Sequence, residues 1–207
     1  MALNNTTKFA AVTVFDAKVY KNVDWTKGYT YSTITALPET TTTTTTGPEF
    51  SVMLDTLKVS NITAEGPSLT ITGGKNDDVL VKRGKKYRME IQDALGTFKA
   101  LETFGMGKFD TSSKEFKVTS EFAGELTIVG EGYLINQAEG TEEIVEFIVP
   151  RFIPDSIVNI NLSSSGDASV FDLNGDILAI KDGSSTESDQ KPDIFYIIKP
   201  KTTAQTT

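Results

Sequence analysis

Apolar and polar residues alternate along most of this chain, and this period of two constrains the fold more than any other feature of the sequence. Successive side chains of a β-strand point to opposite faces, so alternation is typical of strands with one buried face. The strand predicted at residues 50–62 is expected to bulge at Asp55 and Thr56. Strands are predicted at residues 9–20, 29–36, 50–62, 68–72, 79–91, 115–121, 125–137, 142–152, 157–162, 169–173, 176–180 and 194–199.

The segments between these strands are rich in residues that favour tight turns. Gly73-Gly74 is one example, and Asn174-Gly175 between apolar pairs is typical of a type I′ hairpin. The basic run from Lys82 to Lys86 fits the same scheme as a charged turn between two strands. Many short strands joined by such turns predict a mainly β protein, an antiparallel β-sandwich or barrel.

One segment departs from the alternation and predicts a single short α-helix at about residues 93–104. Leu95 and Phe98 begin a series of apolar residues at intervals of three, which follows one stripe of a helix. Asp93 is placed to accept from the first free N–H groups as the N-cap. Gly105 can adopt the left-handed conformation that ends a helix.

No internal repeat or linker divides the chain, so residues 1–207 are expected to form one β domain. A weak boundary at residues 109–113 leaves two smaller domains as an alternative. Residues 37–49 hold an unbroken threonine run and lack the apolar positions of a packed strand, so we expect a flexible loop there. The polar residues 199–207 are expected to form a flexible C-terminal tail.

The chain contains no cysteine and no histidine, which excludes many kinds of site. Disulfide frameworks, zinc fingers and thiol or Ser-His-Asp catalysis all need one of these residues. The glycines beside Lys75 lack the spacing of a phosphate loop, and the residues around Asn174 lack that of a calcium loop. We therefore expect no cofactor, no metal and no enzymatic activity. Pairs such as Glu142 and Glu143 leave a carboxylate-dependent hydrolase as an alternative.

The overall charge bears on possible partners. A net charge of −8 argues against a protein that grips nucleic acid by its phosphates, because such binding rests on clustered lysines and arginines. The first residues lack the layout of a secretory signal, and no apolar run approaches the roughly 20 residues that cross a bilayer. We therefore expect no association with a membrane.

Three stretches resemble virion structural proteins of tailed bacteriophages. They read NITAEGPSLTITGGK (61–75), KKYRMEIQDALG (85–96) and FAGELTIVGEGYLI (122–135). Their order of strands, one helix and further strands is similar to that of the major tail protein, or tail tube protein. The likeness covers roughly residues 50–180. It implies a structural subunit that polymerises as stacked hexameric rings and forms the conduit for DNA ejection.

The resemblance also implies partners and a location. Copies of the chain would contact one another, the tape-measure protein and other tail proteins in the virion tail, after assembly in the host cytoplasm. DNA would pass without specific binding, since an acidic wall repels phosphates. A capsid decoration protein, or another tail or adhesin subunit, remains an alternative. The segments expected to order on assembly give these candidate contact residues: Lys8, Leu37, Thr40, Thr46, Glu49, Lys199 and Lys201.

Overall fold

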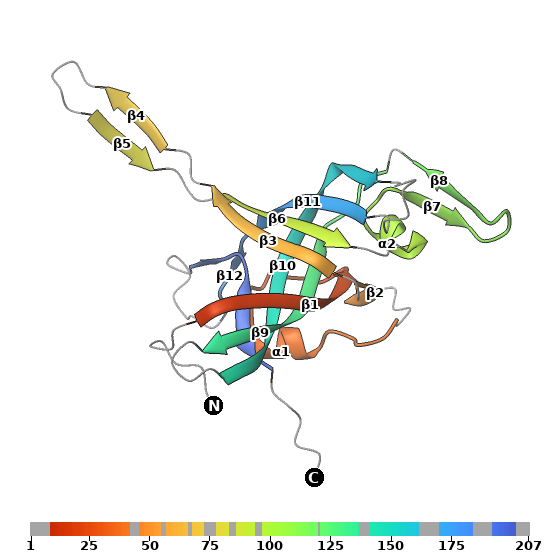
Figure 1. Ribbon diagram of the computed structural model, residues 1–207, viewed down its shortest axis with the longest axis horizontal. Coiled ribbons are helices and arrows are strands. Elements are labelled where there is room, and N and C mark those ends of the chain that lie inside the picture. The colour runs from red at the N-terminus through yellow and green to blue at the C-terminus, as the bar shows by residue number, and fades with distance from the viewer. Residues whose placement is uncertain are drawn as a thin grey trace, which may run out of the picture.

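Antiparallel strands make up most of the molecule, so the expectation of a mainly β fold is confirmed (Figure 1). The computed structural model describes residues 9–41, 46–54, 57–65, 68–72, 78–82, 86–93, 97–119, 121–136, 141–161, 170–183 and 192–201. Its elements are β1 (Phe9–Lys21), α1 (Tyr31–Thr35), β2 (Glu49–Leu54), β3 (Leu57–Glu65), β4 (Ser68–Thr72), β5 (Asp78–Lys82), β6 (Lys86–Asp93), α2 (Phe98–Thr103), β7 (Gly107–Asp110), β8 (Glu115–Val118), β9 (Leu126–Asn136), β10 (Thr141–Asn161), β11 (Val170–Leu178), β12 (Ile180–Lys181), β13 (Asp193–Ile194) and β14 (Ile197–Pro200).

Eight strands form one antiparallel sheet, in the order β2-β1-β9-β10-β11-β6-β3, and β14 pairs with β10 beside this path. The sheet rolls up, so that β3 at one end comes back to contact β1 (Figure 1). Strands from both sides of the weak boundary at residues 109–113 pair within this sheet. Three small two-stranded sheets, β4-β5, β7-β8 and β12-β13, lie outside it.

The longest strand, β10, holds the rolled sheet together. Its first half pairs with β9 and β14, and its second half pairs with β11. The pairing with β9 shifts register between Val149 and Phe152, around Pro150, and the pairing with β11 shifts after Pro154. Proline lacks the N–H that a ladder needs, so irregular pairing is expected at these points. The strands predicted at 142–152 and 157–162 are therefore one continuous, bent strand.

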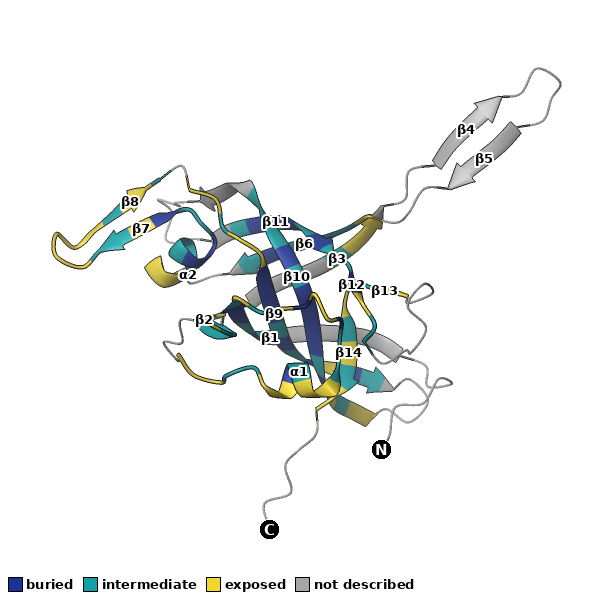
Figure 2. Cartoon of the chain, turned by 180° about the vertical axis from the view of Figure 1, so that it is seen from behind, coloured by how far each residue is buried: buried dark blue, intermediate teal, exposed yellow. Residues whose placement is uncertain are grey.

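The inner face of the roll carries the main hydrophobic core. Alternate residues along the strands point into it, and Val19, Val149, Phe152 and Leu173 are completely buried. Figure 2 shows the buried residues concentrated along β1, β9 and β10. Burying one such side chain contributes about 1.5–3 kcal/mol relative to leaving it in water. Burial on alternate residues thus agrees with the period-two pattern of the sequence.

A second hydrophobic cluster lies on the opposite face of the sheet. It consists of Trp25, Ile34, Ile148 and Ile180, all buried. The segment between β1 and β2, including α1, covers this part of the sheet. Residues on both faces of β10 are therefore buried in its first half, as alternating Ile148 and Val149 show.

The strand predicted at residues 29–36 is wrong, because Tyr31–Thr35 form helix α1. Thr30 is its N-cap: the backbone there is extended, and Thr30 Oγ1 accepts from Thr33 N at 3.2 Å. This local hydrogen bond and the burial of Ile34 outweigh the β preference of the threonines. Tyr29 keeps a single parallel bridge to Asp182.

The helix predicted at 93–104 is shorter than expected. Asp93 is the last residue of β6 rather than the N-cap, and Thr97 caps α2, with Oγ1 accepting from Ala100 N at 3.1 Å. The helix ends where expected, because Gly105 has a φ of +75°. A Cβ there would collide with the Ala123 backbone, so the close approach also favours glycine.

Two further strand predictions are wrong in their connections. The single strand predicted at 50–62 is two strands, β2 and β3, at opposite ends of the sheet order, and Asp55 and Thr56 lie outside the described residues. The hairpin predicted at Asn174-Gly175 does not exist, since β11 runs straight through it between β10 and β6. A Cβ on Gly175 would collide with the Ile153 carbonyl oxygen, so this glycine permits close packing instead of a turn.

Candidate assembly surfaces

A row of polar side chains covers the outer face of β6 and β11. Met89, Ile91 and Leu173 point into the core, and the residues between them point the opposite way. The antiparallel register places the outward residues in facing pairs. These pairs are Arg88 with Asp176, Glu90 with Asn174, and Gln92 with Asp172.

Ion pairs fix one end of this polar face. Arg88 donates to Asp176 Oδ1 at 2.9 Å and also contacts Asp155, and Lys86 lies 2.9 Å from Asp176 Oδ2. At the other end, Asp172 Oδ1 is buried and has no hydrogen-bond partner among the described residues. Including Glu90, this face has four carboxylates but only two cations, so it is acidic. The carboxylates are Glu90, Asp155, Asp172 and Asp176, and the cations are Lys86 and Arg88.

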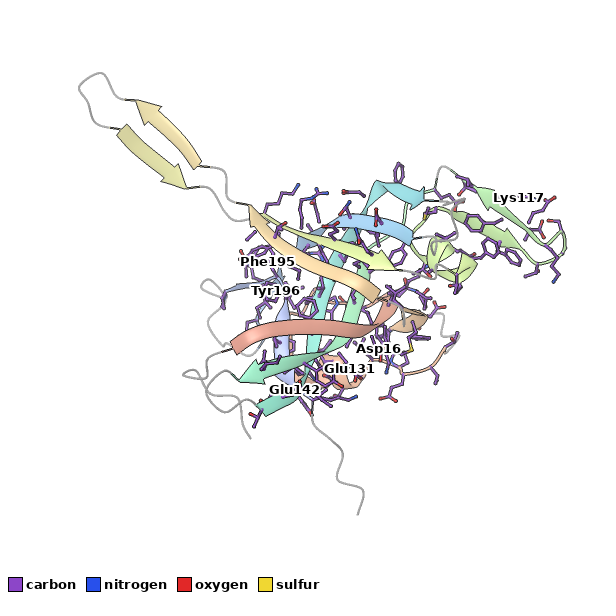
Figure 3. The ribbon with its side chains drawn as sticks, in the orientation of Figure 1. Asp16, Lys117, Glu131, Glu142, Phe195 and Tyr196 are labelled. Atoms are coloured by element: carbon purple, nitrogen blue, oxygen red, sulfur yellow. The ribbon has the colours of Figure 1, made fainter. Side chains whose placement is uncertain are left out.

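A second charged row crosses the outer face of β1, β9, β10 and β14. Register places Asp16 opposite Glu131, Glu131 opposite Glu146, and Glu146 opposite Lys199. Figure 3 shows Asp16 and Glu131 near each other, far from Lys117 on β8. Like charges on facing residues destabilise a sheet unless cations intervene.

The cations come from the C-terminal segment. Lys199 Nζ lies 2.7 Å from Glu146, and Lys201 Nζ lies 2.6 Å from Glu131. Lys199 therefore belongs to a paired strand, and Lys201 N also donates to the Ile144 carbonyl. The flexible tail predicted at 199–207 is wrong for residues 199–201, and residues 202–207 lie outside the described part. Whether these lysines also contact another copy stays a prediction.

The candidate contacts in the 37–49 loop have mixed environments. Leu37 is half-buried, and its N–H donates to the Ile34 carbonyl. Thr40 and Thr46 are exposed, and Glu49 begins β2, paired with Lys21.

Two candidate segments lie outside the described residues. One is Lys8 in the N-terminal arm, and the other is the middle of the threonine run, residues 42–45. The hypothesis of assembly through the arm and the loop therefore stays a prediction.

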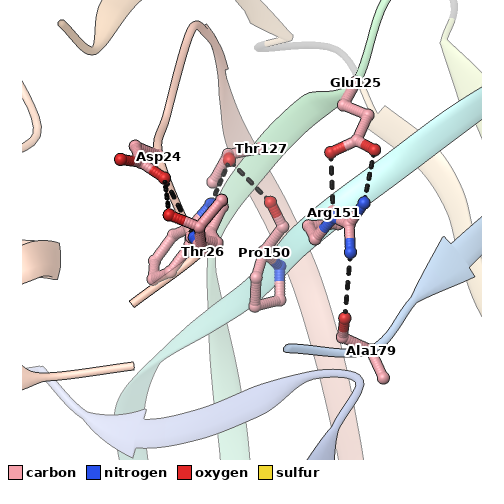
Figure 4. A network of polar contacts seen from close by, with 8 residues as sticks. Asp24, Thr26, Glu125, Thr127, Pro150, Arg151 and Ala179 are labelled. Atoms are coloured by element: carbon pink, nitrogen blue, oxygen red, sulfur yellow. Dashed lines mark hydrogen bonds and ion pairs between the residues drawn. The ribbon is translucent and has the colours of Figure 1, made fainter. Parts of the chain in front are cut away.

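Hydrogen bonds fasten the segment after β1 to the sheet (Figure 4). Trp25 Nε1 donates to Thr127 Oγ1 at 2.9 Å, and Thr127 Oγ1 donates to the Pro150 carbonyl at 2.7 Å. All three residues are buried, so each polar group finds its partner where water is absent. Sequence reasoning missed this contact, because Trp25 and Thr127 are separated by 102 positions in the sequence.

A salt bridge fastens the neighbouring connection. Arg151 donates to both carboxylate oxygens of Glu125, at 2.5 and 2.8 Å, and also donates to the Ala179 carbonyl (Figure 4). The hydrogen bonds from Arg151 hold the pKa of Glu125 below its ordinary value. The bridge thus ties the start of β9 and the end of β11 to the middle of β10.

Two hairpins extend from the body of the molecule (Figure 1). The β7-β8 hairpin is attached to α2 through Phe98, whose ring stacks on Phe109 at 5.2 Å and on Phe116 at 5.4 Å. The β4-β5 hairpin extends away from β3 and β6 on the other side of the molecule. The prediction of a turn near Gly73-Gly74 agrees with the pairing of β4 and β5, although residues 73–77 themselves are not described.

In comparisons with protein-family models and with curated proteins, nothing matches this chain. No helix in the described part of the chain is long and apolar enough to cross a membrane. Function is therefore inferred from the surfaces described above.

Proposed function

We propose that this chain is a structural virion subunit, the wall unit of a tail tube built from stacked rings of identical copies. Hexameric rings and a conduit for DNA ejection follow from the family resemblance of residues 50–180. The observation that carries the proposal is the β4-β5 hairpin, which extends from the sheet as a separate two-stranded unit. A two-stranded ribbon is marginally stable by itself in water. A neighbouring copy would supply the surface that it needs.

The connection of this hairpin supports a role in assembly. Strands β3 and β6 pair down to their ends, where Glu65 faces Lys86. A tight turn at that point would close the β3-β6 hairpin, so the sheet does not require the insertion that carries β4 and β5. An extension without a role in its own sheet is suited to contacts with another copy.

The polar face of β6 and β11 supports the role of a conduit wall. Its carboxylates repel phosphates, and its two cations, Arg88 and Lys86, are engaged by Asp155 and Asp176. Clustered free cations would bind DNA, and every contact would then have to be released as the DNA moved. We propose that this face lines the lumen.

The first experiment images the purified full-length chain by negative-stain electron microscopy and measures its mass by light scattering. Tubes or six-fold rings are expected. The decisive variant replaces residues 66–85 with Asn-Gly, a two-residue turn that suits the facing positions of Glu65 and Lys86. This variant should fold, by circular dichroism, yet stay monomeric.

A control variant replaces exposed Lys27, in the segment between β1 and α1, with Gln, and it should assemble normally. A full-length chain that remains monomeric at all concentrations would contradict the proposal. Rings formed equally well by the Asn-Gly variant would remove the hairpin as the assembly element.

A further inference from the structure

A recess on the outer face of the sheet combines carboxylates with aromatic rings. It has a volume of about 280 Å³ and lies between β1, β9, β10, β14 and the α1 region. Its carboxylates are Asp16, Glu39, Glu131 and Glu146, and its aromatic residues are Tyr20 and Tyr31. Side chains from segments far apart in the sequence thus meet at one place.

One tyrosine of this recess is almost fully buried. Tyr20 is only 3% exposed, and its ring packs edge-on against Phe50 at 5.8 Å. Among the described residues, its hydroxyl has no hydrogen-bond partner, although it lines the recess. Its oxygen is not among the buried polar atoms that lack a partner, so water can reach it, and a bound donor would take the place of that water.

The tyrosine is held in its neutral form. Burial, together with the nearby charges of Glu39 and Glu146, raises the pKa of Tyr20 to about 12. At neutral pH its oxygen can therefore accept a hydrogen bond beside two carboxylates. That combination suits a cationic donor.

The charges around the recess favour one added cation. Lys199 and Lys201 neutralise Glu146 and Glu131, and no salt bridge joins Asp16 or Glu39 to a described residue. Lys18 also lines the recess. The ammonium groups of Lys18, Lys199 and Lys201 therefore face four carboxylates, which leaves the recess with a net charge of −1.

The molecule already binds an ammonium group in this way. Lys199 Nζ lies 5.5 Å from the centre of the Tyr31 ring while it pairs with Glu146. A carboxylate and an aromatic face together stabilise a cation more than either does alone. The Tyr20 ring is buried, so Tyr20 can offer only its hydroxyl oxygen, to which Asp16 and Glu39 add two carboxylates.

We propose that this recess binds one ammonium or guanidinium group, with the Tyr20 oxygen as acceptor and Asp16 and Glu39 as counter-charges. The cation can come from a lysine or arginine of a neighbouring copy or from a small free amine. The site does not depend on the proposed tube, since a free cation tests it in the single chain.

The experiment titrates dilute full-length chain with N-acetylarginine amide and with butylammonium at low salt, followed by NMR. Saturable binding in the millimolar range is expected for a single charged group. Tyr20→Phe should weaken it about threefold to tenfold, as expected for one lost hydrogen bond. The double variant Asp16→Asn with Glu39→Gln should weaken it more than tenfold.

Two controls separate this site from general attraction to an acidic protein. Glu142→Gln changes an exposed carboxylate that does not line the recess, and it should leave affinity unchanged. Butyramide, a neutral counterpart of butylammonium, should not bind. Equal affinity in the double variant, or no saturable binding by the unmodified chain, overturns the proposal.

Sedimentation of the full-length chain at assembling concentrations then distinguishes the two sources of the cation. If a neighbour's side chain occupies the recess, N-acetylarginine amide and Glu39→Gln should both reduce assembly. If assembly is unchanged while the cation binds, the ligand is a small free amine. Both results require that the recess bind a cation. A recess that binds no cation is therefore distinguished from a chain that forms no rings.

Discussion

The two halves of the sheet's outer face differ in whether another segment of the chain covers them. Over β9 and the first half of β10, the segment after β1 covers the sheet and buries Trp25, Ile34 and Ile148 in a second hydrophobic cluster. Over β6 and β11, the outer face carries charged and amide side chains, most of them partly exposed. The half over β9 and β10 is stabilised by the apolar side chains that the covering segment buries. The half over β6 and β11 keeps a polar surface that can face a partner or a lumen.

The largest expected effect tests the covered half. Trp25→Ala removes a ring that is 5% exposed and leaves a cavity against Ile148, so the free energy of unfolding should fall by about 3–5 kcal/mol. Chemical denaturation followed by circular dichroism measures it, because the variant lacks the chain's only tryptophan.

Trp25→Phe is the matched control for this prediction. It keeps most of the apolar volume but cannot donate to Thr127, so its loss should be clearly smaller than that of Trp25→Ala. If Trp25→Ala lowers the free energy of unfolding by less than about 1 kcal/mol, the segment after β1 adds little to stability.

A smaller effect is expected on the polar half. Arg88→Ala leaves Asp155 and Asp176 without their guanidinium, but both are about one-third exposed, so water compensates in part. The free energy of unfolding should fall by about 1 kcal/mol, measured by the same denaturation. Lys181→Ala, which breaks an exposed bridge to Asp193, serves as control and should change it by less than about 0.5 kcal/mol. A loss for Arg88→Ala as large as that for Trp25→Ala would erase the contrast between the halves.

The smallest effect concerns pH at the edge of the covered half. Arg151 lowers the pKa of Glu125 in the folded state, so this bridge stabilises the fold above the ordinary pKa of 4.5 and is lost as pH falls through the lowered value. Glu125 is about half exposed, so its contribution should be a few tenths of a kcal/mol.

Glu125→Gln isolates that contribution. Its deficit in unfolding free energy should be present at pH 7 and shrink as the pH falls below 4.5, as measured by urea denaturation at pH 7 and at pH 3. A deficit of the same size at both values would mean that the charge of Glu125 plays no part.

Alternation predicted the β class, because period two follows directly from strand geometry. It failed where tertiary context decides the outcome. Asn174-Gly175 has the composition of a turn, but strands on both sides hold it extended. Residues 29–36 have strand propensity, but a cap at Thr30 and the burial of Ile34 select a helix.

The candidate sites were harder to predict than the fold. The recess gathers Asp16, Glu39, Glu131 and Glu146 from three strands and a loop, and only the register of β1, β9 and β10 places them together. Lys199 was interpreted as part of a free tail because its neighbours are polar. Its pairing with Glu146 depends on β14 joining β10, which local sequence does not encode.

The pairing of Glu65 with Lys86 has a consequence for the order of folding. Joining β3 to β6 directly would require the chain to close a loop of residues 66–85, at an entropic cost that grows with loop length. The local pairing of β4 with β5 places Ser68 beside Lys82, which leaves only residues 66–67 and 83–85 to be closed. The hairpin proposed to bind a neighbour would thus also speed the pairing of one edge of the sheet in its own chain.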